Sequence, residues 1–199
     1  MFWAIWLEDA VKNFRIWGFF ALQYFTAWGV WMTTAYFTFA TITHLRYRKK
    51  EQGLKDSESP WCAWKCLSAL FKTALLWECV IASVYWPTMY PADRRTHMND
   101  FKWNFANACD HLLPICVLFI DWLLNRIYYE WNQIYANLGV FVLYGIVNIS
   151  VTLLSGKPVY SMMSWDSVGS VMIALAIFPL ATVYYIGLYY LTRFKFRKM

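Results

Sequence analysis

The chain has 199 residues, of which 60% are hydrophobic and 21% aromatic, and its mean hydropathy is +0.35. This composition is typical of a protein that has lipid as its main solvent, so it predicts one integral membrane domain over residues 1–199. The net charge of +6 does not indicate nucleic-acid binding, because the basic residues flank apolar runs and do not follow one face. The odd number of five cysteines predicts no disulfide framework.

The first 16 residues mix aromatic side chains with charges at Glu8, Asp9 and Lys12. A cleavable secretory signal would place positive charge before a longer apolar core. We therefore expect residues 1–16 to form an amphipathic helix that lies in the membrane interface.

Five apolar segments follow, each long enough to cross the hydrocarbon core of a bilayer. They cover about 17–42, 61–86, 105–125, 134–154 and 168–191. A basic loop from His44 to Lys55 separates the first two, and a polar loop from Tyr90 to Trp103 separates the second and third. The sequence thus predicts an all-α fold, a polytopic transmembrane bundle of about five helices preceded by the interfacial helix.

Lysine and arginine are more numerous on the face that carries the His44 to Lys55 loop and the C-terminal cluster. The positive-inside bias then places the C-terminus on the cytosolic or matrix side and the N-terminus outside. The sequence does not choose between the endomembrane system, the plasma membrane and the mitochondrial inner membrane.

Four polar side chains from four different spans are expected at one depth. With a helical rise of about 1.5 Å per residue, Thr26, Glu78, His111 and Asn148 lie roughly 9–13 Å from the outer face. Ionisable groups are costly inside a bilayer, so this layer is a site hypothesis. Lys72 and Asp121 share a second layer, at roughly 21 and 24 Å, where we expect them to form a structural ion pair.

The outer layer contains the groups needed for nucleophilic catalysis. A threonine hydroxyl becomes a nucleophile when a neighbouring base takes its proton, and a neutral imidazole does this if a third group orients it. Thr26 and His111 fit these two roles, with Glu78, Asn107 or Asp110 as the orienting group. The substrate of such a site would be a lipid that enters from the bilayer.

Simpler roles exist for both residues. A transmembrane threonine commonly bonds a carbonyl of its own helix, and His111 lies close to Pro114, which leaves a carbonyl unpaired. We expect no metal or cofactor: Cys62 and Cys66 form a pair without two further ligands, and the chain has no HxxxH motif.

Three short stretches of the sequence resemble motifs of a known protein family. They are Tyr24-Phe25-Thr26-Ala27-Trp28, Asn107-Ala108-Cys109-Asp110-His111 followed ten residues later by Asp121, and Gly156-Lys157-Pro158-Val159-Tyr160 with Trp165. From Leu22 onward, the chain resembles the androgen-induced protein / androgen-dependent TFPI-regulating protein / rolling stone family of polytopic membrane proteins.

This resemblance implies a helical membrane protein, and some members of the family hydrolyse fatty acid esters of hydroxy fatty acids. It also implies that Thr26 is the nucleophile and His111 the base. The family commonly has Tyr-Pro after the late glycine motif, where this chain has Tyr160-Ser161. Other members, rolling stone among them, act in cell fusion.

Two hypotheses follow. A Thr/His lipid-ester hydrolase would have Thr26 and His111 facing a shared cavity open to lipid. A non-catalytic accessory subunit of a larger membrane complex would have the same layer packed shut, with its aromatic surfaces against partner helices or lipid. The expected partners are membrane lipids and, in the second case, other membrane subunits.

Overall fold

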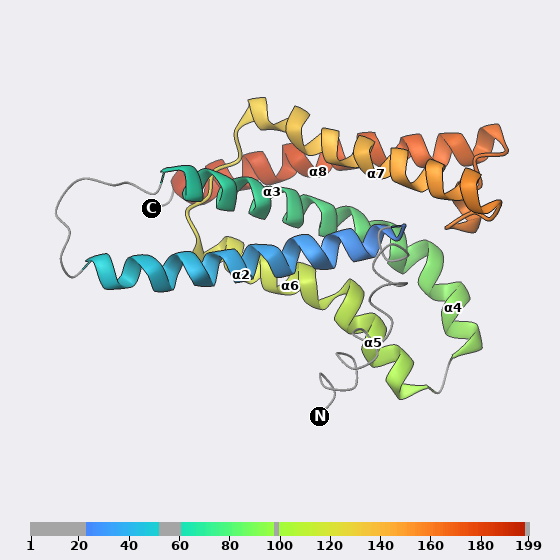
Figure 1. Ribbon diagram of the computed structural model, residues 1–199, viewed down its shortest axis with the longest axis horizontal. Helices are drawn as coiled ribbons and strands as arrows, with labels where there is room; N and C mark the ends of the chain where they lie inside the picture. The colour runs from blue at the N-terminus through green and yellow to red at the C-terminus, as the bar shows by residue number, and fades with distance from the viewer. Residues whose placement is uncertain (1–22, 52–60, 98–99, 198–199) are drawn as a thin grey trace.

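The computed structural model describes residues 23–51, 61–97 and 100–197, and these ranges are helical, without strands (Figure 1). The long helices are α2 (Phe25–Glu51), α3 (Trp61–Val84), α5 (Phe101–His111), α6 (Leu113–Leu124), α7 (Ile134–Ser155) and α8 (Val168–Arg197). The short ones are η1 (Tyr85–Met89), α4 (Tyr90–Thr96), η2 (Trp131–Gln133) and η3 (Ser161–Met163). Four described segments are long and apolar enough to cross a membrane: Ala63–Met89, Phe101–Leu124, Trp131–Ser155 and Val168–Arg197. The prediction of an all-α membrane bundle is confirmed.

Helix α3 forms the centre of the bundle. It contacts α2, α6 and α8, and Phe71, Leu75, Trp77 and Val80 on this helix are completely buried. The helices around it expose large apolar side chains at positions such as Leu154, which is 89% exposed. A water-soluble protein rarely exposes so much apolar surface, so lipid is the environment that this surface fits.

Helix α2 runs past the predicted end of the first span, residue 42, to Glu51. Most of the expected loop from His44 onward is therefore helical, because Leu, Arg, Lys and Glu favour the helix and no Gly or Pro interrupts the stretch to Glu51. Residues 1–22 lie outside the described residues, and with them lie the predicted interfacial helix and the start of the first span.

The third predicted span, 105–125, consists of two helices. Asp100 begins α5, because its carboxylate accepts hydrogen bonds from the backbone N–H groups of Lys102 (2.9 Å) and Trp103 (3.1 Å). Pro114 lacks an N–H group and its ring crowds the preceding turn, so α5 ends at His111 and α6 begins at Leu113. The break places His111 at the last position of a helix.

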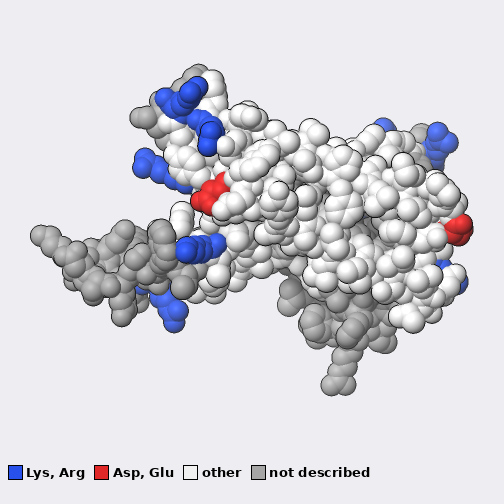
Figure 2. Space-filling model, turned by 90° about the horizontal axis from the view of Figure 1, so that it is seen from above, with Lys and Arg blue, Asp and Glu red and all other residues white. Residues whose placement is uncertain are grey.

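The ends of the long helices gather at the two ends of the molecule. The start of α2 and the end of α3 lie at the same end as the finish of α7 and the start of α8 (Figure 1). Figure 2 shows Lys and Arg mainly at the two ends of the molecule, with an uncharged middle. This is the distribution expected when lipid covers the middle of a bundle.

Candidate functional site

The imidazole of His111 lies flat against a tyrosine ring. Its centroid is 3.4 Å from that of Tyr85, and the two planes differ by 9°. His111 Nδ1 is buried and has no hydrogen-bond partner. Tyr85 opens η1, where the helix widens to a π-helix, a feature that is frequent at functional sites. The stack fixes the orientation of His111 while one of its nitrogens stays unused.

Of the expected orienting groups, Asn107 acts indirectly. Its side-chain oxygen accepts a hydrogen bond from the Tyr85 hydroxyl, and its amide donates to the Trp103 carbonyl at 3.1 Å. Asn107 therefore holds the ring on which His111 is stacked. Asp110 is exposed on the surface of α5.

Thr26 is half-buried in the first turn of α2, and the residue before it is firmly held. The Phe25 ring stacks on Trp77 with centroids 4.3 Å apart, and the Trp77 indole donates to the Phe25 carbonyl at 2.9 Å. The Phe25 N–H donates to the hydroxyl of Tyr160 at 2.8 Å. A tyrosine far along the chain thus supplies the helix cap that the local sequence lacks. Burial raises the pKa of the Tyr160 hydroxyl, so this cap stays uncharged.

Asn148 connects α7 to the residues that precede Thr26. It is completely buried, and its oxygen accepts from the Trp165 indole at 2.8 Å. Its amide donates to the Tyr144 hydroxyl at 3.2 Å, and Tyr144 donates to the Gln23 carbonyl at 2.8 Å. Each side-chain polar atom of Asn148 has a partner, so its role here is to hold the loop and the start of α2 together.

Glu78 is completely buried against α2. A Cβ atom placed on Gly29 would be 2.4 Å from Glu78 Oε1, so this carboxyl group fills the space that a side chain would occupy. Neither Glu78 oxygen nor Thr33 Oγ1 has a hydrogen-bond partner. Gly29 lies three residues after Thr26, which puts Glu78 against the same part of α2.

The predicted outer layer is therefore divided. Glu78 and the hydrogen-bonded group of Asn148 lie around the beginning of α2, whereas His111 lies on Tyr85 at the end of α3. Helix α5, which ends at His111, contacts both α2 and α3. Because His111 Nδ1 has no partner, the Thr26 hydroxyl does not bond to it in this conformation.

Lys72 and Asp121 do not pair as expected. Lys72 Nζ donates to the side-chain oxygen of Gln133 at 2.5 Å. Asp121 Oδ2 accepts from the Tyr36 hydroxyl at 2.6 Å and from Asn125 Nδ2 at 3.0 Å. The expected ion pair was wrong because equal depth along two helices does not set the direction in which each side chain points.

Three residues were missed as members of the site: Tyr85, Tyr160 and Trp165. Tyr85 lies two helical turns after Glu78, so the helical period already placed it on the same face as Glu78, at the point where α3 continues into η1. Nothing local indicated that the Tyr160 hydroxyl caps α2. Across the described ranges, no three His, Cys, Asp or Glu side chains come together where they could hold a metal ion.

Comparisons with models of protein families, with curated proteins and with solved structures found no match to the chain. The resemblance of its short motifs to the androgen-induced protein / rolling stone family therefore stays a prediction.

Proposed function

We propose that the chain is an integral membrane hydrolase of lipid esters, with Thr26 as the nucleophile and His111 as the general base. The substrate class is that of fatty acid esters of hydroxy fatty acids, which the resemblance of the three motifs implies. The observation that carries the proposal is the state of His111: its ring is held against Tyr85, and its buried Nδ1 has no partner.

A general base needs a fixed direction and a free lone pair. The hydrogen bond from Tyr85 to Asn107 holds the tyrosine ring, and the ring holds the imidazole. Most buried polar atoms have a hydrogen-bond partner, so an unpaired nitrogen in this position calls for an explanation. Taking the proton of a nucleophile is a role that leaves the nitrogen unpaired until substrate binds.

The reaction uses a hydroxyl and an imidazole. Thr26 Oγ1 attacks the ester carbonyl carbon while His111 takes the hydroxyl proton, and a tetrahedral intermediate forms. When this intermediate collapses, the bond to the alcohol oxygen breaks, and His111 returns the proton to the released alcohol. Water, activated by the same imidazole, then attacks the acyl-threonine ester, which releases the fatty acid and restores Thr26.

Apolar surface beside His111 fits a substrate that arrives from the bilayer. Leu112 and Leu113, which follow it directly, are 45% and 51% exposed. Catalysis requires the Thr26 hydroxyl and His111 to come within about 3 Å of each other, so substrate binding has to bring the start of α2 and the end of α5 together. Helices α2 and α5 are already in contact, which supports a movement of this kind.

The test is labelling of the purified protein by a fluorophosphonate probe, together with release of free fatty acid from a hydroxy fatty acid ester in nanodiscs. We expect Thr26→Ala and His111→Ala to abolish both signals, and Thr26→Ser to retain labelling. Thr41→Ala and His44→Ala are matched controls that keep both, because these two exposed residues lie elsewhere on α2. Absence of labelling in the wild type, or unchanged labelling in both site variants, would overturn the proposal.

A second candidate is a non-catalytic accessory subunit of a larger membrane complex. The packing of Phe25 favours it, since the rings of Trp77, Phe141 and Tyr144 all lie against this residue next to Thr26. Purification in a mild detergent decides between the two. Co-migration with a large assembly, without ester hydrolysis, supports the subunit, whereas an active chain that migrates alone contradicts it.

A further inference from the structure

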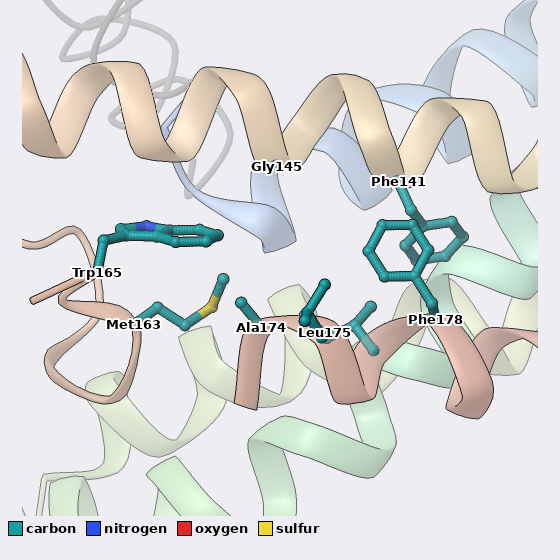
Figure 3. Close-up of a pocket in the computed structure, with 8 residues that line it drawn as sticks. Phe141, Gly145, Met163, Trp165, Ala174, Leu175 and Phe178 are labelled. Carbon is teal, nitrogen blue, oxygen red and sulfur yellow. The ribbon is translucent and has the colours of Figure 1, made fainter. Parts of the chain in front are cut away.

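A small apolar cavity lies between α7 and α8 and has a volume of about 40 Å³. Figure 3 shows its lining side chains facing a gap beneath Gly145: Phe141 from α7, Met163 and Trp165 from the connecting loop, and Ala174 and Phe178 from α8. A Cβ atom placed on Gly145 would meet nothing within 4 Å, so the glycine leaves this gap open.

Trp165 forms one wall in an unusual backbone conformation. Its φ angle is 63°, in the left-handed region that a bulky residue rarely adopts. Its indole nitrogen donates to the buried Asn148, so its polar atom is engaged outside the cavity. Strained backbone of this kind persists when the surroundings hold it and is concentrated at functional sites.

The cavity is one layer of side chains away from the beginning of α2. Phe141 lines the cavity, and its ring centroid lies 5.9 Å from that of Phe25, the residue before Thr26. The hydrogen bonds from Trp165 through Asn148 and Tyr144 lead to Gln23 at the same place. The cavity wall is therefore connected, through side-chain contacts and hydrogen bonds, to the residues that precede Thr26.

We propose that this cavity binds the end of the acyl chain of the ester, an inference that rests on the proposed hydrolase function. Its walls are apolar, and a water molecule needs two to four polar partners, so water is a poor occupant. Both helices belong to segments apolar enough to span a membrane, so hydrocarbon chains are the solvent on this side of the bundle. A cavity of about 150 Å³ binds benzene, or about 25 Å³ per carbon, so this cavity has room for one or two carbons at the end of a chain.

The experiment fills the cavity and follows two readouts in nanodiscs. The first is cross-linking by a palmitoyl ester with a diazirine on its last carbon, mapped by mass spectrometry. The second is the dependence of hydrolysis on acyl chain length. We expect the wild type to be labelled between Met163 and Phe178, and Gly145→Leu to lower this labelling about fourfold or more, because one or two buried methylene groups are lost. The preferred acyl chain should shorten by about one or two carbons.

Ala174→Leu fills the same cavity from α8 and keeps the test valid if Gly145→Leu does not fold. Gly139→Leu is the matched control, since this glycine is on α7, exposed, and has nothing within 4 Å of its added Cβ. It should change neither readout. Equal labelling in the wild type and both filled variants, or an unchanged chain-length profile, overturns the proposal. Labelling at the cavity without hydrolysis by the wild type would overturn the proposed hydrolase and leave a binding site for hydrocarbon chains.

Discussion

At Gly29 on α2, even the small step from glycine to alanine should destabilise the fold. A Cβ atom there would lie 2.4 Å from Glu78 Oε1 and 2.6 Å from Ile81 Cδ1. Glu78 is completely buried and Ile81 is 2% exposed, so neither can turn outward to make room. We therefore expect Gly29→Ala to push α2 and α3 apart.

The magnitude follows from two opposing effects. Overpacking of a filled core costs about 1–3 kcal/mol. Alanine is favoured over glycine within a helix by about 1 kcal/mol, which offsets part of this cost. The control Gly187→Ala, where the added Cβ meets nothing within 4 Å, shows the second effect alone. The free energy of unfolding of Gly29→Ala should thus fall about 1–3 kcal/mol below that of the control.

Unfolding in mixed micelles, started by adding a denaturing detergent and followed by tryptophan fluorescence, measures this difference. A second substitution gives a sharper test, because Ile81→Val removes the Cδ1 atom that the new methyl group meets. The double variant should recover part of the stability lost in Gly29→Ala. Equal or greater stability of Gly29→Ala relative to Gly187→Ala would refute the close packing of α2 on Glu78 and Ile81.

Three further predictions use the same unfolding assay. Tyr160→Phe should cost about 0.5–2 kcal/mol because it removes the cap from the Phe25 N–H, and no loss would mean that this cap is not formed. Lys195→Met should lower the free energy of unfolding by about 1–3 kcal/mol, because the Lys195 ammonium donates to the carbonyls of Trp122 and Asn125 at the end of α6. The control Lys157→Met, at an exposed position, should change it by less than about 0.5 kcal/mol. Lys72→Met and Asp121→Asn should be additive within about 0.5 kcal/mol, and a coupling above about 1 kcal/mol would restore the ion pair between them.

The helices are the part of the fold that the sequence predicts well. Expected and observed boundaries agree closely for the fourth span, 134–154, which is α7 from Ile134 to Ser155. They diverge where helix-forming polar residues continue an apolar run, as in α2, and where Pro114 divides one run into two helices. The length of an apolar run shows how much of a helix lipid can cover. The helix itself continues for as long as its residues favour helical backbone, so the two lengths can differ.

The site was predicted less completely. His111 and Glu78 were singled out because ionisable groups inside a bilayer are costly, and both are buried or half-buried with unpaired atoms. Their neighbours were not predictable: the Tyr85 ring on His111 and Gly29 beneath Glu78 depend on which face of each helix turns toward the next. The Tyr160 cap joins residues 135 positions apart.

The sequence by itself determined the apolar, membrane-spanning character of the helices and the helical fold, because hydrophobicity and helix propensity are local properties. Only the tertiary structure decided the partners. It gave Lys72 and Asp121 different hydrogen-bond partners, stacked His111 on Tyr85 and opened a cavity beside Gly145. These outcomes depend on how each helix is rotated about its axis, and packing between helices sets that rotation.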